Sequence, residues 1–98
     1  MVQVGLLVRL VAKAERAEDV ATFLASATPL AEAETFTPAW FAYRADDTTF
    51  YITDAFANEE DRQRHVDGPI AKALCAKAPE LLAQPPEIVP VTVLGSKF

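Results

Sequence analysis

The sequence predicts a single α+β domain in which helices cover one face of a four-stranded antiparallel sheet. Three observations support this class. Apolar residues recur with the period of a strand in four segments and with the period of a helix between them. The chain has 98 residues, a length typical of one domain, so we expect a single domain over residues 1–98. Its composition, 51% hydrophobic and 23% charged, is too apolar for a disordered chain.

The first two predicted elements are a strand and a helix. Residues 2–11 are rich in β-branched side chains, and every even position is apolar, which predicts a strand. From about Arg16, apolar residues follow helical spacing as far as Ala31. Pro29 lies inside this pattern and removes a main-chain hydrogen bond, so we expect the helix to kink or loosen beyond Thr28.

Two aromatic-rich stretches, 36–45 and 48–56, predict a hairpin that turns at Asp46 and Asp47. Asn58 and the three carboxylates that follow it predict the start of a short helix that continues to Val66.

Pro69 suits the first turn of a third helix, which the prolines after Gln84 should end. Residues 87–94 predict the last strand. The order β-α-β-β-α-α-β, with right-handed crossovers, places the first and third strands at the centre of a ferredoxin-like sheet. Pro38 and Pro90 then fall in the two edge strands, where a missing N–H is tolerated.

The hairpin turn sorts side chains onto two faces of the sheet. A two-residue turn at 46–47 places five large apolar residues on one face, which we assign to the helices: Phe41, Tyr43, Phe50, Ile52 and Phe56. The other face then carries Trp40, Tyr51 and Leu7, with Arg9, Arg44, Thr49 and Thr53 as its polar residues. Because this apolar patch is large for a monomer, we expect a homodimer in which a second copy covers it. The alternative is a monomer with a flat surface that tolerates a few aromatic residues.

His65 is the only histidine and follows Asp61 by one helical turn. Two interpretations are open: a general base at the mouth of a pocket between helix and sheet, or a solvated residue on a charged helix. Asp54 lies between apolar residues of an expected central strand, where a carboxylate needs partners or a raised pKa. It is either a pocket acid or base, or a cap for the next helix. Tyr43 is either a phenolic group in an aromatic pocket wall or part of the core.

Several classes of protein are disfavoured. The net charge of -5 argues against nucleic acid or anionic membranes as partners. No apolar run is long enough to span a bilayer, and the N-terminus does not resemble a signal peptide, so we expect a cytoplasmic protein. Cys75 is the only cysteine, and we expect it to be a small buried apolar residue. No metal-ligand spacing and no glycine-rich phosphate loop is present, so we expect neither metal nor cofactor.

The segments Trp40–Arg44 and Phe50–Phe56, then Asn58–Glu60 and His65, resemble the antibiotic biosynthesis monooxygenase family. The resemblance spans nearly the whole chain and is to the smaller, quinol-monooxygenase-like members. It implies a dimeric α/β barrel that oxygenates a small aromatic phenol or quinol without metal or flavin, because the deprotonated substrate itself reduces oxygen.

The resemblance also implies that His65 corresponds to the family's helix histidine, whereas Tyr43 and Asp54 come from the face assignment alone. The haem-degrading branch uses an asparagine on the first strand and a tryptophan on the second helix. This sequence has no asparagine in its first strand, and Trp40 belongs to a strand, which argues against haem degradation.

These observations lead to an expected function with two alternatives. We expect a cofactor-independent monooxygenase with His65, Asp54 and Tyr43 as catalytic candidates. The substrate-binding candidates are Phe41, Phe50, Ile52 and Phe56. One alternative is a non-catalytic dimer that binds a small molecule or acts as a regulator. The other is a protein whose pocket is filled by its own aromatic residues and which acts through a macromolecular partner.

Overall fold

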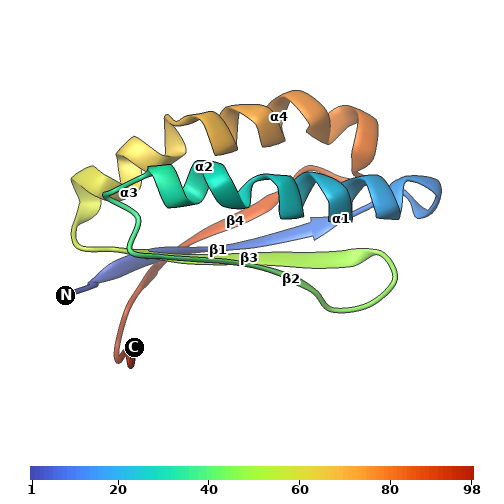
Figure 1. The fold of residues 1–98 in the computed structure, drawn as a ribbon. Helices are drawn as coiled ribbons and strands as arrows, with labels where there is room; N and C mark the ends of the chain where they lie inside the picture. Colours follow the sequence, from blue (N-terminus) through green and yellow to red (C-terminus); the bar gives the residue numbers. More distant parts are fainter.

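The computed structural model describes all 98 residues. Four strands form one antiparallel sheet: β1 Val4–Val11, β2 Ala39–Arg44, β3 Thr49–Phe56 and β4 Glu87–Thr92. After a short 3-10 turn at Ala14–Arg16 come the helices α1 Ala17–Ser26, α2 Thr28–Ala33, α3 Glu59–Val66 and α4 Pro69–Leu81. All four helices lie over the same face of the sheet, and the other face carries no helix (Figure 1).

The strand order is β2-β3-β1-β4, so β1 and β3 are central and β2 and β4 are edges. This order confirms the predicted ferredoxin-like α+β fold. Pro90 lies in β4 opposite Leu6, and Pro38 immediately precedes β2. Both prolines are therefore at sheet edges, where the missing N–H leaves no central hydrogen bond unmade.

The helices begin close to where the sequence predicts, and α4 ends at Leu81, before the prolines that were expected to end it. The interruption expected at Pro29 is the boundary between α1 and α2, and Pro29 occupies the first turn of α2, where its missing N–H has no partner to lose. Asn58 caps α3, because its side-chain oxygen accepts the N–H of Asp61 at 2.8 Å.

The core fills the space between the sheet and the helices. Side chains alternate along β3, so that Phe50, Ile52, Asp54 and Phe56 are buried beneath the helices. Phe50 and Phe56 are at most 1% exposed. The prediction that these β3 residues face the helices is confirmed.

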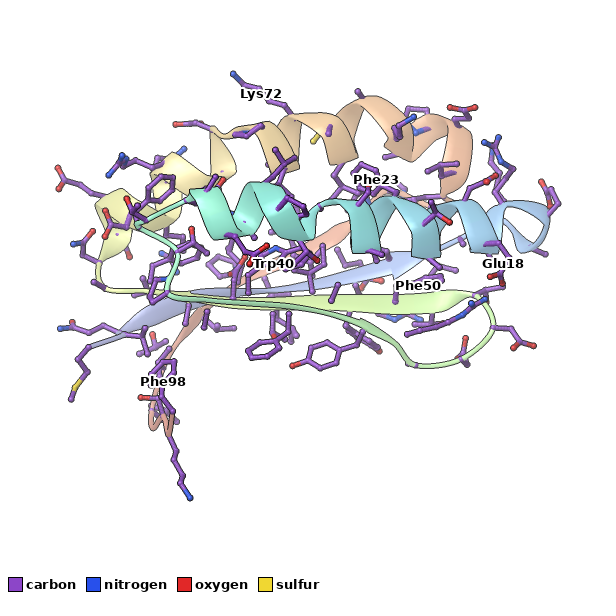
Figure 2. All side chains as sticks on the ribbon, in the orientation of Figure 1. Glu18, Phe23, Trp40, Phe50, Lys72 and Phe98 are labelled. Carbon is purple, nitrogen blue, oxygen red and sulfur yellow. The ribbon has the colours of Figure 1, made fainter.

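The predicted faces of β2 are wrong, because the hairpin register differs by one residue. The N–H of Ala45 donates to the carbonyl of Thr49 at 2.8 Å, so the turn contains three residues, Asp46 to Thr48, and not two. Trp40 is consequently paired with Asp54 and lies between the sheet and the helix layer (Figure 2). A one-residue change of register moves every β2 side chain to the opposite face.

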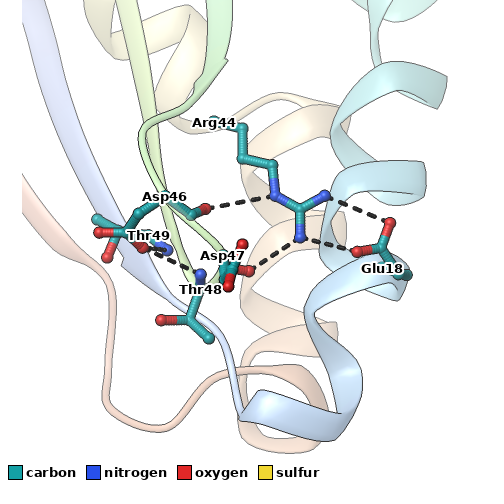
Figure 3. Close-up of polar contacts among 6 residues, drawn as sticks. All are labelled: Glu18, Arg44, Asp46, Asp47, Thr48 and Thr49. Carbon is teal, nitrogen blue, oxygen red and sulfur yellow. Dashed lines mark hydrogen bonds and ion pairs between the residues drawn. The ribbon is translucent and has the colours of Figure 1, made fainter.

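Polar contacts fix this register. The carboxylate of Asp46 accepts the main-chain N–H groups of Thr48 and Thr49 at 3.0 and 2.8 Å, which stabilises the longer turn. Arg44 reaches up to α1 and pairs with Glu18 at 2.8 Å (Figure 3). Arg44 can make this contact only from the helix-facing side of β2, so it does not belong to the open face as predicted.

The face without helices, here called the open face, carries several exposed apolar side chains. Leu7 is 41% exposed, Phe41 56%, Tyr43 47% and Val89 48%. Phe41 and Tyr43 stack with ring centroids 6.1 Å apart. The residues after β4 extend on the same side (Figure 1), with Leu94 and Phe98 exposed. None of the helices has the length and apolar character needed to cross a membrane.

Candidate active site

The single histidine is buried, although it belongs to the most polar helix. His65 lies in the last turn of α3 and is 5% exposed. Its ring packs against Phe56 at a centroid distance of 5.2 Å. Both ring nitrogens meet carboxylates: Nδ1 is 2.7 Å from Glu34 Oε1, and Nε2 is 3.2 Å from Asp54 Oδ2. The interpretation of His65 as a solvated surface residue is therefore wrong. Its expected partner Asp61 contacts Arg64 at 3.8 Å.

Asp54 is held in place by the neighbouring central strand. Its Oδ1 accepts the main-chain N–H of Leu6 at 3.0 Å, and its side chain is 1% exposed. Its Oδ2 lies close to His65 but has no well-aligned hydrogen-bond donor. Asp54 does not cap α3, because Asn58 does. It therefore belongs to the pocket.

A glycine makes this strand contact possible. A methyl group on Gly5 would overlap the main-chain carbonyl oxygen of Asp54. Only a residue without Cβ lets β1 approach β3 this closely beside the carboxylate.

Glu34 is the carboxylate that sequence analysis did not identify. It follows α2 directly and is 7% exposed. Its Oε1 contacts His65 and also accepts the hydroxyl of Thr37 at 2.8 Å, while Oε2 has no hydrogen-bond partner. Glu34 and His65 are 31 positions apart in the chain, so no local spacing connects them. The only available signal was an acidic residue between two apolar segments.

The two carboxylates decide the charge of the imidazole. Burial alone lowers the pKa of His65, because it penalises the charged form. The close contact and negative charge of Asp54, followed by the hydrogen bond and charge of Glu34, outweigh this effect, so the pKa of His65 is raised above 6.5. The arrangement therefore favours an imidazolium between two carboxylates.

A cavity of about 130 Å³ lies beside this cluster, between the sheet and α3 and α4. Asp54 and His65 form the charged part of its wall. Most of the remaining wall is aliphatic, including Leu6, Val8, Ile52, Ile70, Leu74 and Ile88. We call it the His65 cavity. It places one buried acid–base pair against otherwise apolar walls, which is typical of a site for a small apolar ligand with one polar group.

The structure brings some of the predicted site residues together and separates others. Ile52 lines the His65 cavity, and Phe56 supports the imidazole ring from the core. Phe50 is buried further along β3, beneath the guanidinium of Arg44. Tyr43 and Phe41 lie on the open face because of the hairpin register, so the prediction that they line the same cavity is wrong. Tyr43 instead accepts a hydrogen bond from Thr53 at 3.2 Å.

Comparison with solved structures places the chain among proteins of the same fold. It matches the crystal structure of NE2512 from Nitrosomonas europaea, a protein of unknown function, with 49% identity and a TM-score of 0.97 over 100% of this chain and 95% of that one. No protein-family model and no curated protein matches the sequence.

Two further structures carry an indication of activity in their names. A candidate antibiotic biosynthesis monooxygenase from Nitrosomonas europaea has a TM-score of 0.83 at 15% identity, covering 94% of this chain and 90% of that one. Another from Caulobacter crescentus has a TM-score of 0.82 at 14% identity, covering 96% and 92%. The chain therefore belongs to the same family as NE2512, and its fold is that of the antibiotic biosynthesis monooxygenases.

Proposed function

We propose that this protein is a cofactor-independent monooxygenase that oxygenates a small aromatic phenol or quinol in the His65 cavity. The observation that carries the proposal is a buried Asp54–His65 pair in the wall of an otherwise apolar cavity. The fold shared with candidate monooxygenases supports the same class of reaction.

The reaction needs a base and a stabilised anion. Asp54 takes a proton from the bound phenol or from the carbon of its keto tautomer, since Asp54 Oδ2 has no well-aligned donor of its own. The imidazolium of His65 stabilises the resulting anion, which the apolar walls leave otherwise unsolvated. The electron-rich anion then passes one electron to molecular oxygen, and the two radicals combine to form a carbon–oxygen bond.

Atoms and electrons balance without a separate reductant. For a substrate with a reactive methylene group, that group and one molecule of oxygen become a carbonyl group and one molecule of water. The protonated pair returns one proton to the peroxide. Loss of the second hydrogen of the carbon as a proton then breaks the O–O bond and releases water. All four electrons come from the substrate carbon.

Oxygen consumption tests the proposal. Purified protein is mixed with anthrones, naphthols and hydroquinones in an oxygen electrode, with a protein-free blank for autoxidation. Asp54→Asn and His65→Ala should each lower the rate by about 100- to 10,000-fold. Lys72→Ala, on the outer side of α4 (Figure 2), should not change it. The oxygenase proposal fails if no substrate consumes oxygen above the blank and His65→Ala changes nothing.

One observation favours a second candidate, a non-catalytic dimer that binds an apolar metabolite. Both ring nitrogens of His65 already contact carboxylates, as expected if the imidazole only holds α3 against the sheet. Ligand-induced thermal stabilisation without oxygen consumption would support this candidate over the oxygenase.

We further propose that the protein acts as a homodimer joined through the open face. Phe41, Leu7 and Val89 together expose apolar surface that the protein's own helices do not cover. An identical open face, related by a two-fold axis, offers complementary apolar surface.

A further inference from the structure

Cys75 lines two neighbouring cavities. It forms part of the wall of the His65 cavity, and a second cavity of about 410 Å³ begins at the same residue. Contrary to prediction, Cys75 is exposed. The second cavity, here called the α4–β4 groove, lies between the end of α4 and the segment that leads to β4. Its apolar lining consists of Ala78, Pro79, Leu82, Ala83, Pro85 and Pro86.

The two cavities follow one side of α4. Ala71, Cys75 and Ala78 are three or four positions apart and therefore lie on the same side of the helix. Their small side chains leave room between the helix and edge strand β4. Ile88, which lines the His65 cavity from β4, is 51% exposed, so the helices do not seal this edge. From Cys75 to Leu81, the last residue of α4, the helix rises about 9 Å along its axis.

The chemistry of the two spaces differs. The His65 cavity, at about 130 Å³, is slightly smaller than the roughly 150 Å³ apolar cavity that accommodates benzene, so it holds at most one aromatic ring, with the hydroxyl at Asp54. No charged side chain lines the α4–β4 groove, and Gln84 is its one amide. The groove can therefore stabilise an apolar chain by burial and offers little to a polar substituent.

We propose that the substrate is a phenol or quinol with an apolar chain, whose ring occupies the His65 cavity and whose chain passes Cys75 into the α4–β4 groove. The position of the ring rests on the proposed function. The position of the alkyl chain rests on Cys75, which lines both cavities.

Calorimetric titration with phenol and a series of 4-alkylphenols tests the proposal without requiring turnover. Each methylene buried in the groove should lower the Kd about three- to fourfold. The dependence should level off once the chain reaches the end of the groove. A Kd that does not change with chain length, or the absence of binding by any member, would overturn the proposal.

A matched pair of variants tests where the alkyl chain of the ligand lies. Ala83→Phe narrows the groove from its exposed rim and should remove the dependence on chain length while leaving the Kd of phenol unchanged. Ala76→Phe makes the same change at an exposed position of α4 outside both cavities, and should retain the wild-type dependence. If the Kd depends equally on alkyl chain length in both variants, the alkyl chain lies outside the groove and the assignment is refuted.

Cys75 gives a second measurement that needs no variant. 4-Octylphenol at saturation should slow alkylation of Cys75 by iodoacetamide at least several-fold more than phenol at saturation. Equal protection by both ligands would contradict an alkyl chain that passes the thiol.

Dependence of the Kd on chain length without oxygen consumption would retain the groove and reject the oxygenase. Oxygen consumption that requires His65, together with a Kd that does not depend on chain length, would retain the oxygenase and reject the groove.

Discussion

His65 experiences two opposing influences on its pKa. Burial lowers the value, whereas the carboxylates of Asp54 and Glu34 raise it by more, so the pKa in the folded protein exceeds 6.5. Protonation of His65 therefore stabilises the folded state. This contribution is complete below the unfolded-state pKa of about 6.5, and it is lost as pH rises through the higher folded-state value.

Replacing Glu34 should reveal this linkage. Glu34→Gln keeps an oxygen for the Nδ1–H of His65 but removes a negative charge, so the pKa of His65 should fall. The loss of stability that comes from His65 as pH rises above about 6.5 should then become smaller. As the only histidine, His65 gives a single set of imidazole signals in NMR, which reports the pKa, and urea unfolding reports the stability.

Glu32 provides the control for this experiment, since it is an exposed carboxylate on α2 two positions earlier. Glu32→Gln should leave the pKa of His65 and the stability within about 0.5 kcal/mol of wild type. Glu34→Ala, which leaves the imidazolium without one of its partners, should cost roughly 3–5 kcal/mol. Identical titration of His65 in the wild type and in Glu34→Gln would show that the two side chains do not interact in solution.

The contact between β1 and β3 sets the position of Asp54 at the scale of elements. The two strands pair along their whole length, and Leu6 on β1 holds the carboxylate through its N–H. Gly5, the neighbouring residue, allows the close approach on which this hydrogen bond depends.

Gly5→Ala should therefore disturb the site as well as the sheet. The added methyl group meets main-chain atoms of Asp54, which can move only together with β3. We expect a loss of stability of about 1–3 kcal/mol, measured by urea unfolding, and a shifted His65 ring signal. Gly95→Ala is the matched control, because nothing lies within 4 Å of the added methyl group. Equal stability of the two variants would indicate that the strands separate without cost.

The whole molecule has one covered sheet face and one open face. If the open face joins two copies, the protein should have twice the 10.7 kDa mass of the chain when measured by light scattering or sedimentation. Phe41→Asp introduces a charge into this face and should shift the equilibrium to monomer. Leu30→Asp makes a similar change at a residue of α2 that is 41% exposed, and should leave the dimer intact. A wild-type monomer in dilute solution would disprove the dimer.

Much of this fold is predictable from the sequence, because the responsible signals are local. The break at Pro29, the cap at Asn58 and the alternation along β3 each depend on residues a few positions apart. The register of the hairpin is different. It depends on a turn stabilised by Asp46 and on the pairing of Arg44 with Glu18, 26 positions away. A distant ion pair leaves no periodic pattern in the sequence. The prediction therefore assigned the side chains of β2 to the wrong faces of the sheet.

The candidate site also has a part that the sequence predicts and a part that only the tertiary structure reveals. Residue type and strand alternation alone made His65, Asp54 and Tyr43 candidates and placed Asp54 on the helix-facing side of the sheet. Only the tertiary structure decided that Glu34 completes the cluster, that Tyr43 lies outside it, and that Cys75 lines two cavities. The physical reason is that periodicity specifies which face of its own element a residue occupies, whereas packing between elements determines which distant residues share a buried space.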